Sequence, residues 1–165
     1  MAYAPDHALI ATPIGMIRIS GDDVALARIA IEGREPEPER AGEGRAVRET
    51  VAQLRAYFQG ELTSFDLPLI PFDSPRGEAL REAIASVGYG DALSYGALAR
   101  QAGSGPRAIG QACARNPYPI VIPCHRILAS GGRLGAYSAG EGPKTKQWLL
   151  NHEARHAGKA EPWAA

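Results

Sequence analysis

The chain has 165 residues, of which 45% are hydrophobic and 22% charged, and it has a formal net charge of zero and two cysteines. These values are typical of a globular protein with one compact domain or two small ones. They exclude a disulfide-rich secreted scaffold. The N-terminal segment lacks a signal-peptide pattern and no apolar run is long enough to cross a membrane, so we expect a cytoplasmic protein without a membrane partner.

The zero net charge conceals an uneven distribution of charge along the chain. Residues 1–93 contain nine Arg and fifteen Asp or Glu, whereas residues 94–165 contain nine Arg or Lys and only three Glu. This split indicates either that the C-terminal part faces a polyanion or that charges have segregated by chance on a solvated surface.

The first third of the sequence predicts β structure followed by a helix. Segments 8–12, 15–20 and 24–32 alternate apolar and polar residues and are separated by Gly, Pro and Asp, which is typical of a hairpin or meander. The polar stretch 32–45 is expected to be a solvated connection. A helix is predicted from residue 46 to Gly60, with an apolar face made of Val47, Val51, Leu54, Tyr57 and Phe58.

The proline-rich segment 65–77 is interpreted as an inter-domain linker. It would separate an N-terminal α/β domain, residues 1–72, from a C-terminal domain, residues 73–165. The C-terminal domain is predicted to be mainly helical, beginning with a helix over residues 74–88 and ending with one over residues 144–158.

Two short helices are predicted between these ends, over residues 94–102 and 106–116. The three residues between them contain two glycines, and Pro106 suits the first position of a helix. This pattern fits a DNA-binding helix-turn-helix, but it fits a plain helical hairpin equally well.

The residues most indicative of chemistry are Cys124, His125 and Arg126. They follow residues 117–123, which contain three prolines and are predicted to form a buried extended segment. A thiol is nucleophilic only as the thiolate, and a neighbouring imidazole or cation lowers its pKa. Cys124 is therefore a candidate nucleophile. The alternative for a free cysteine is a small buried hydrophobic residue, which is the role predicted for Cys113.

A second motif lies in the last helix, where residues 152–156 read HEARH and match the zinc-protease pattern H-E-x-x-H. Zinc requires a third protein ligand, which the sequence does not mark. Alternatively, Glu153 hydrogen-bonds to His125 and fixes its tautomer, in a Cys124–His125–Glu153 chain that follows the logic of a catalytic triad.

Several motifs in order along the chain resemble the O6-alkylguanine-DNA alkyltransferases, a family of suicide DNA-repair proteins. They are SYGALA, RAIG, RNPYPIVIPCHRI, GAYSAG and WLLNHE, and the likeness is dense from about residue 92 to residue 153. A looser likeness, in TPIGMIRIS and LRAYFQGELTSFDLPL, covers most of the N-terminal part. The resemblance implies an α/β fold, with a small N-terminal β-sheet plus helix domain followed by a mainly helical C-terminal domain that holds a winged-helix-like helix-turn-helix.

The resemblance also implies roles for the residues of the alkyl-transfer site. Cys124 would accept the alkyl group, and His125 would act as a base through a bound water. Glu153 would orient His125, and Asn116 would brace the segment that carries the cysteine.

Other residues are implied in DNA binding. Tyr95 would help to rotate the phosphate of the target nucleotide, and Arg107 would fill the gap left by the flipped guanine. Ala108 and Gly110 would ease close approach to the minor groove, and Arg126 would contact the DNA. Tyr137 and Ser138 would line the pocket for the flipped base. The sequence departs from the family pattern at Ala136, where asparagine is common, at Ala139, where glycine is common, and in the short turn Gly103-Ser104-Gly105.

The sequence thus predicts a monomeric DNA-repair protein of the cytoplasm that acts on chromosomal DNA. It would transfer the alkyl group from O6-alkylguanine in double-stranded DNA to Cys124, once per chain and without cofactor or metal. Base flipping is required because O6 is inaccessible within a paired duplex. The alternatives are a lesion-binding protein without transfer activity, a zinc protease, and a helix-turn-helix regulator that binds unmodified DNA.

Overall fold

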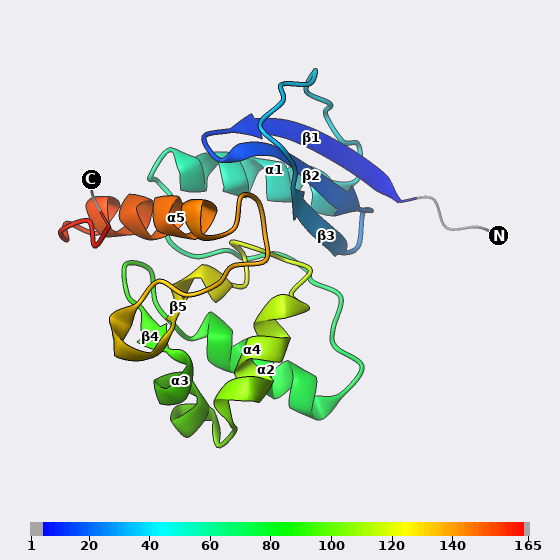
Figure 1. Cartoon of the computed structure of the whole chain (residues 1–165). Coiled ribbons are helices and arrows are strands. Elements are labelled where there is room, and N and C mark those ends of the chain that lie inside the picture. Colours follow the sequence, from blue (N-terminus) through cyan, green and yellow to red (C-terminus); the bar gives the residue numbers. More distant parts are fainter. Residues whose placement is uncertain (1–4, 164–165) are drawn as a thin grey trace. The chain divides into compact units, whose positions relative to one another are not determined.

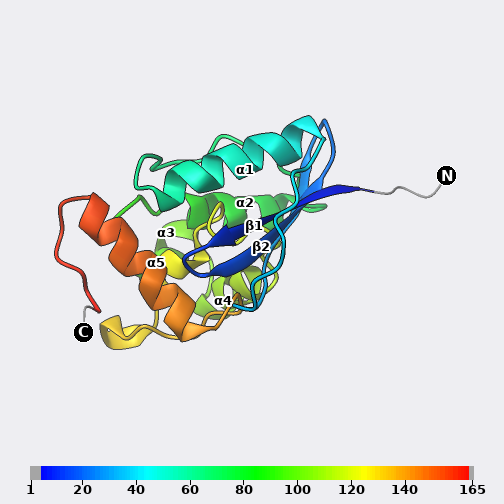
Figure 2. The same ribbon diagram turned by 90° about the horizontal axis from the view of Figure 1, so that it is seen from above.

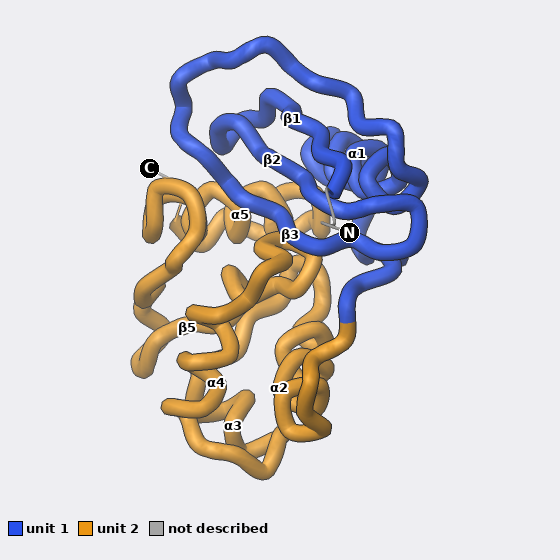
Figure 3. The backbone as a smooth tube through the Cα atoms, turned by 90° about the vertical axis from the view of Figure 1, so that its right-hand side faces the viewer, with its two compact units in different colours: residues 1–70 blue, residues 71–165 orange. Residues whose placement is uncertain are grey.

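The computed structural model describes residues 5–163. The chain divides after Ile70 into two compact units, residues 1–70 and 71–165 (Figure 3). None of the helices among the described residues has the length and apolar character needed to cross a membrane.

The first unit is a three-stranded antiparallel sheet with one helix packed against it (Figures 1 and 2). The strands β1 (Asp6–Thr12), β2 (Gly15–Gly21) and β3 (Leu26–Ile31) lie in chain order. The helix α1 (Arg45–Phe58) follows. The predicted meander and helix are thus confirmed. The core between them is formed by apolar residues of the strands and of the helix, among them Ala8, Ile10, Ile17, Ile19, Leu26, Ile29, Val47, Leu54 and Tyr57.

Only part of the segment 65–77 serves as the predicted linker between the two units. The backbone N–H of Leu26 donates to the Pro68 carbonyl at 2.7 Å, so this part of the segment is fastened to the edge of the first unit. At the other end, Pro75 begins helix α2 (Pro75–Ala85), and the Ser74 hydroxyl caps this helix by accepting from the Gly77 N–H. Proline fits here because the first helical position needs no N–H donor.

The second unit is mainly helical. After α2 it contains a short strand β4 (Leu93–Ser94), helices α3 (Tyr95–Ala102) and α4 (Pro106–Ala114), and the strand β5 (Ile127–Leu128), which pairs in parallel with β4. Two single-turn 3₁₀ helices, Cys124–Arg126 and Ser130–Gly132, flank β5, and α5 (Pro143–His156) follows.

The helix-turn-helix is formed by α3 and α4, which pack on each other and bury Leu98 and Ile109. The Ser94 hydroxyl caps α3 by accepting from the Ala97 N–H at 3.0 Å. Gly103 ends α3 in the left-handed region, with φ 65°, which an L side chain rarely adopts. Pro106 then starts α4. The glycine and the proline therefore set the length of the turn.

Residues 117–123 are buried but not extended, and this part of the prediction is wrong. Ile120 has a φ of 75°, and the Ile122 N–H donates to the Tyr118 carbonyl at 2.9 Å, which closes a turn. The Asn116 side chain replaces missing strand partners, because its oxygen accepts from the Tyr118 N–H and its amide nitrogen donates to the Ile122 carbonyl. Prolines lack the N–H that a strand ladder needs, so the segment forms a turn that is held by hydrogen bonds with the Asn116 side chain instead.

Candidate functional site

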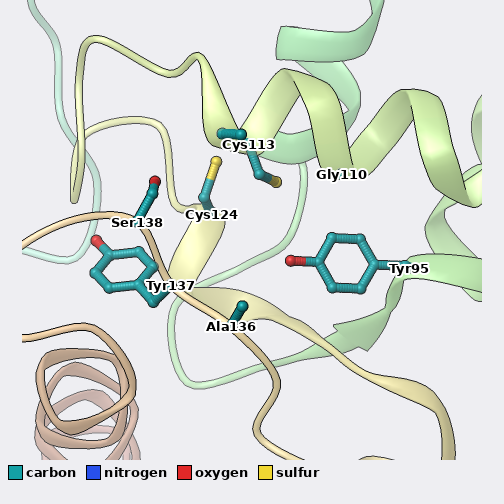
Figure 4. Close-up of a pocket in the computed structure, with 8 residues that line it drawn as sticks. Tyr95, Gly110, Cys113, Cys124, Ala136, Tyr137 and Ser138 are labelled. Carbon is teal, nitrogen blue, oxygen red and sulfur yellow. The ribbon is translucent and has the colours of Figure 1, made fainter.

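Cys124 opens the first 3₁₀ helix and lies on the wall of a cavity of about 100 Å³ in the second unit (Figure 4). The cavity draws its walls from the start of α3, the second half of α4 and the loop before α5. Its lining residues are Tyr95, Gly110, Cys113, Ala114, Cys124, Ala136, Tyr137 and Ser138. The fold therefore brings the predicted nucleophile together with residues predicted for DNA binding and for the base pocket.

Asn116 positions the cysteine. Its amide nitrogen donates to the Cys124 sulfur at 3.3 Å and to the Ile122 carbonyl at 2.9 Å. The Asn116 backbone N–H donates to the Cys113 carbonyl at 3.2 Å. A single residue thus connects the end of α4 to the turn and to the thiol.

Glu153 of α5 is the centre of a buried cluster of charged and polar side chains. One carboxylate oxygen lies 2.7 Å from His125 Nε2, and Arg126 donates to both oxygens at 2.8 and 3.0 Å. A further guanidinium nitrogen of Arg126 donates to the Val87 carbonyl at 2.7 Å. All three charged or titratable side chains are buried, and Glu153 and His125 are 0% exposed.

The cluster keeps Glu153 ionised and His125 neutral. Burial opposes ionisation of Glu153, but His125 and Arg126 together hold the pKa of this carboxyl well below its usual value. Burial lowers the pKa of His125, against the opposing effect of Glu153. A carboxylate can only accept, so the His125 Nε2–H donates to it and the lone pair of the neutral ring lies on Nδ1.

That lone pair is free to act as a base. Nδ1 of His125 is buried and has no hydrogen-bond partner among the described residues. Buried polar atoms are nearly always paired with protein or with ordered water, so an orphaned ring nitrogen in the residue next to Cys124 indicates a functional role.

Cys113 lies nearer to Cys124 than the sequence indicated. It was predicted to be a small buried hydrophobic residue, and it is buried, but it also lines the cavity beside Cys124 (Figure 4). This contact, together with burial, raises the pKa of Cys124, whereas the Asn116 amide and the Lys146 charge act in the opposite direction. Cys124 therefore rests as a thiol and needs a base to ionise.

Lys146 of α5 is a site residue that the sequence reasoning missed. It is 0% exposed, and its ammonium group donates to the carbonyls of Ile127 and Ala136 at 2.6 and 3.2 Å. Burial lowers the pKa of Lys146 to about 8. The lysine thus ties β5 to the loop that forms one wall of the cavity. A signal was present, because residues 146, 149, 150 and 153 share the buried face of one helix at helical spacing.

Arg126 does not lie where the prediction put it. It was expected to contact DNA, but it is 6% exposed and its guanidinium is used by Glu153 and by the Val87 carbonyl. A buried arginine held by a carboxylate gives up these bonds only at a large cost. The predicted DNA contact of Arg126 is therefore withdrawn, and Arg126 is part of the Glu153 cluster.

The other predicted DNA contacts lie on α4 and α3. Arg107 is exposed and borders an open groove beside Tyr95 and Gly110. Gly110 faces both this groove and the cavity, and a methyl group added there would meet no atom within 4 Å. Ala108 lines a separate hollow beside Phe72 and is not part of the cavity.

The HEARH segment forms packing contacts rather than a cluster of zinc ligands. The His152 ring stacks on Trp148 at a centroid distance of 4.8 Å, and the His156 ring is tilted against the His152 ring at a centroid distance of 4.4 Å. His156 Nδ1 bonds to the His152 carbonyl at 2.8 Å, and Glu153 faces His125 instead. Across residues 5–163 no three His, Cys, Asp or Glu side chains are grouped so that they could hold a metal ion.

Comparison with known proteins gives matches over nearly the whole chain. Residues 7–71 match the ribonuclease-like domain of 6-O-methylguanine DNA methyltransferase, and residues 76–155 match the DNA-binding domain of the same family. A methylated-DNA–protein-cysteine methyltransferase of Mycolicibacterium paratuberculosis is 38% identical over 157 residues, covering 92% of this chain and 94% of the relative. A DNA base-flipping protein of Thermus thermophilus is 40% identical over 146 residues, covering 86% and 95%.

Solved structures agree with the sequence matches. Mycobacterium tuberculosis OGT in complex with DNA is similar with a TM-score of 0.76 and 33% identity, covering 90% of this chain and 92% of that one. The fold and the comparisons define an α/β protein of the class that repairs alkylated DNA. The chain belongs to the 6-O-methylguanine DNA methyltransferase family.

The buried carboxylate generates a prediction for stability. Replacing Glu153 by Gln leaves Arg126 buried without a counter-charge, so at neutral pH the free energy of unfolding should fall by on the order of 3 kcal/mol. The pKa of Glu153 is lower in the folded than in the unfolded state, so its contribution is present above the ordinary value of 4.5 and is lost as the pH falls below it. The wild-type chain should therefore lose stability more steeply than Glu153→Gln on acidification.

Urea unfolding followed by circular dichroism, from neutral pH to about pH 3, checks this difference. The matched control is Glu82→Gln, which removes an exposed carboxylate from α2 of the same unit. Equal stabilities of Glu153→Gln and Glu82→Gln at neutral pH would contradict the assigned role of the carboxylate.

Proposed function

We propose that this chain repairs DNA by moving the alkyl group of O6-alkylguanine onto the Cys124 sulfur, once per molecule. The observation that carries the proposal is the free lone pair of His125 Nδ1. Glu153 holds the ring through the opposite nitrogen, and the adjacent residue of the same 3₁₀ helix, Cys124, lines a cavity. The family supplies the class of reaction, and the site supplies a nucleophile, a base and an orienting carboxylate.

The proposed chemistry balances without a cofactor. His125 takes the Cys124 proton, by way of a water, as the thiolate attacks the alkyl carbon. The carbon–sulfur bond forms while the bond from carbon to O6 breaks, and the guanine leaves as an anion that is reprotonated. Glu153 stabilises the imidazolium that forms, and Arg126 keeps that carboxylate ionised. The product is a thioether, which has no good leaving group, so the chain is used once.

The cavity requires the base to come out of the duplex, because O6 of a stacked, paired guanine cannot reach a buried sulfur. We propose that Tyr95 and Arg107, which border the groove on α3 and α4, promote and hold the flipped state. Gly110 leaves room for close approach, and Tyr137 and Ser138 enclose the base. The presence of DNA in the Mycobacterium tuberculosis OGT structure supports this partner. The proposal takes the substrate as double-stranded DNA and the active form as a cytoplasmic monomer.

A second candidate is base flipping without transfer. The Thermus thermophilus relative carries the name DNA base-flipping protein. A protein that only binds lesions needs no nucleophile and no base. This chain has both, in the form of Cys124 and His125, and so transfer is the better account.

Stoichiometry tests the proposed function. Full-length chain incubated with excess duplex containing O6-methylguanine should gain one methyl group per chain, and peptide mapping should locate it on Cys124. Cys124→Ser should still bind the lesion but gain no methyl group, because a serine hydroxyl is much less acidic than a thiol and a much weaker nucleophile toward an alkyl carbon. Repair of many lesions per chain, or methyl label on Cys113 with Cys124 unmodified, would overturn the mechanism. Lesion binding without any gain in mass would instead favour the base-flipping candidate.

Arg107 gives a separate test of base flipping. Arg107→Ala should slow methyl transfer from duplex DNA and should affect transfer from a free alkylated guanine much less, since the free base needs no flipping. Single-turnover rates on the two substrates measure the effect. Arg155→Ala, which removes an exposed charge from α5, controls for the loss of positive charge alone. Equal slowing of Arg107→Ala on both substrates would argue against the role in flipping.

A further inference from the structure

The two cysteines of the chain lie together in the cavity, although eleven positions separate them in the sequence. Cys113 comes from the last turn of α4 and Cys124 from the 3₁₀ helix, and both side chains project into the same space (Figure 4). Both residues are buried, and both line the same cavity of about 100 Å³. The proposed alkyl transfer uses only one of them.

The backbone around the pair is held by the Asn116 contacts already described. Asn116 bonds to the Cys113 carbonyl through its backbone and to the Cys124 sulfur through its side chain. The two cysteines enclose residues 114–123, a short loop that is closed in the folded chain. A covalent bond between the sulfurs would therefore close this short loop between two residues that already line one cavity.

We propose that Cys113 and Cys124 form a reversible disulfide when a peroxide oxidises the pair. In the first step a thiolate sulfur attacks an oxygen of the peroxide, the O–O bond breaks, one water is released, and the sulfur becomes a sulfenic acid. In the second step the other sulfur attacks this sulfur, the S–S bond forms, and the sulfenic oxygen leaves as a second water. Two electrons pass from the two sulfurs to the peroxide, and either order of attack gives the same product.

The electrostatics of the pair favour this reaction. The Cys124 thiol lowers the pKa of Cys113, and the Lys146 charge acts in the same direction. Cys113 is thus the more acidic thiol of the two, and the thiolate is the form that reacts with peroxide. Cys113 then serves as the resolving thiol for a sulfenic acid on Cys124, or Cys124 resolves a sulfenic acid on Cys113.

Loss of the nucleophile to oxidation matters because, on the proposed function, each chain can use Cys124 only once. A disulfide blocks transfer, since Cys124 can no longer ionise, but a thiol reductant restores it. Without a partner, a sulfenic acid on Cys124 continues to sulfinic acid, which a thiol does not reduce. The disulfide therefore preserves unused molecules through oxidation.

The test compares the wild-type chain with Cys113→Ser, and with Cys113→Ala as a second variant in case serine disturbs the fold. Each protein is treated with graded hydrogen peroxide, and samples are taken before and after dithiothreitol. Denaturing mass spectrometry under non-reducing conditions should show a monomer that has lost two hydrogen atoms, and peptide mapping should show residue 113 linked to residue 124. Circular dichroism checks that each protein is folded.

Methyl transfer is then measured on the same samples, relative to each protein before oxidation. Wild type should lose transfer with peroxide and recover nearly all of it with dithiothreitol, whereas Cys113→Ser and Cys113→Ala should recover several-fold less. Absence of the 113–124 link, or equal recovery by wild type and variants, would overturn the proposal. The mass measurement does not depend on transfer, so a chain that forms the link but transfers no methyl group refutes the proposed function alone.

Discussion

The second unit is organised around one buried negative charge, the Glu153 carboxylate. Removing a carboxylate from water is costly, and here three hydrogen bonds from His125 and Arg126 compensate for it. The same bonds join α5 to the 3₁₀ helix that carries Cys124, and Arg126 extends the connection to the Val87 carbonyl beyond α2. The carboxylate therefore sets both the position of the cysteine segment and the protonation of the imidazole beside it.

The chemistry of the Cys124 thiol depends on this hydrogen-bonded arrangement around Glu153. Burial and the Cys113 contact keep Cys124 protonated at rest, which suits a nucleophile that can be spent only once. In the proposed mechanism, ionisation is left to His125, whose free nitrogen takes the proton when a substrate fills the cavity. Lys146 contributes from the other side, since it holds the cavity wall through two carbonyls and places a positive charge near both sulfurs. These groups lie on elements that are distant in sequence, and the fold alone brings them together.

Much of the fold follows from local sequence signals. Alternating strands, the apolar face of α1 and the glycine and proline around the α3–α4 turn all act over a few residues, and so they were predictable. The Cys124, His125 and Glu153 set was accessible because a cysteine beside a histidine and a glutamate in the last helix match the logic of a catalytic triad, and because the motifs that hold them resemble a known family. The turn at Ile120, the burial of Arg126 and the meeting of Cys113 with Cys124 depend on contacts between distant segments. No periodicity or local propensity reports such contacts, and the basic character of Arg126 even pointed to the wrong partner.

The most direct test of this account is the tautomer of His125, observed by nitrogen-15 NMR of the histidine rings and assigned with a His125→Gln variant. The account predicts a neutral ring at neutral pH, protonated on Nε2 and unprotonated on Nδ1, and it predicts that the ring stays neutral on mild acidification because burial lowers the pKa of His125. A ring protonated on Nδ1, or a doubly protonated ring at neutral pH, would contradict it.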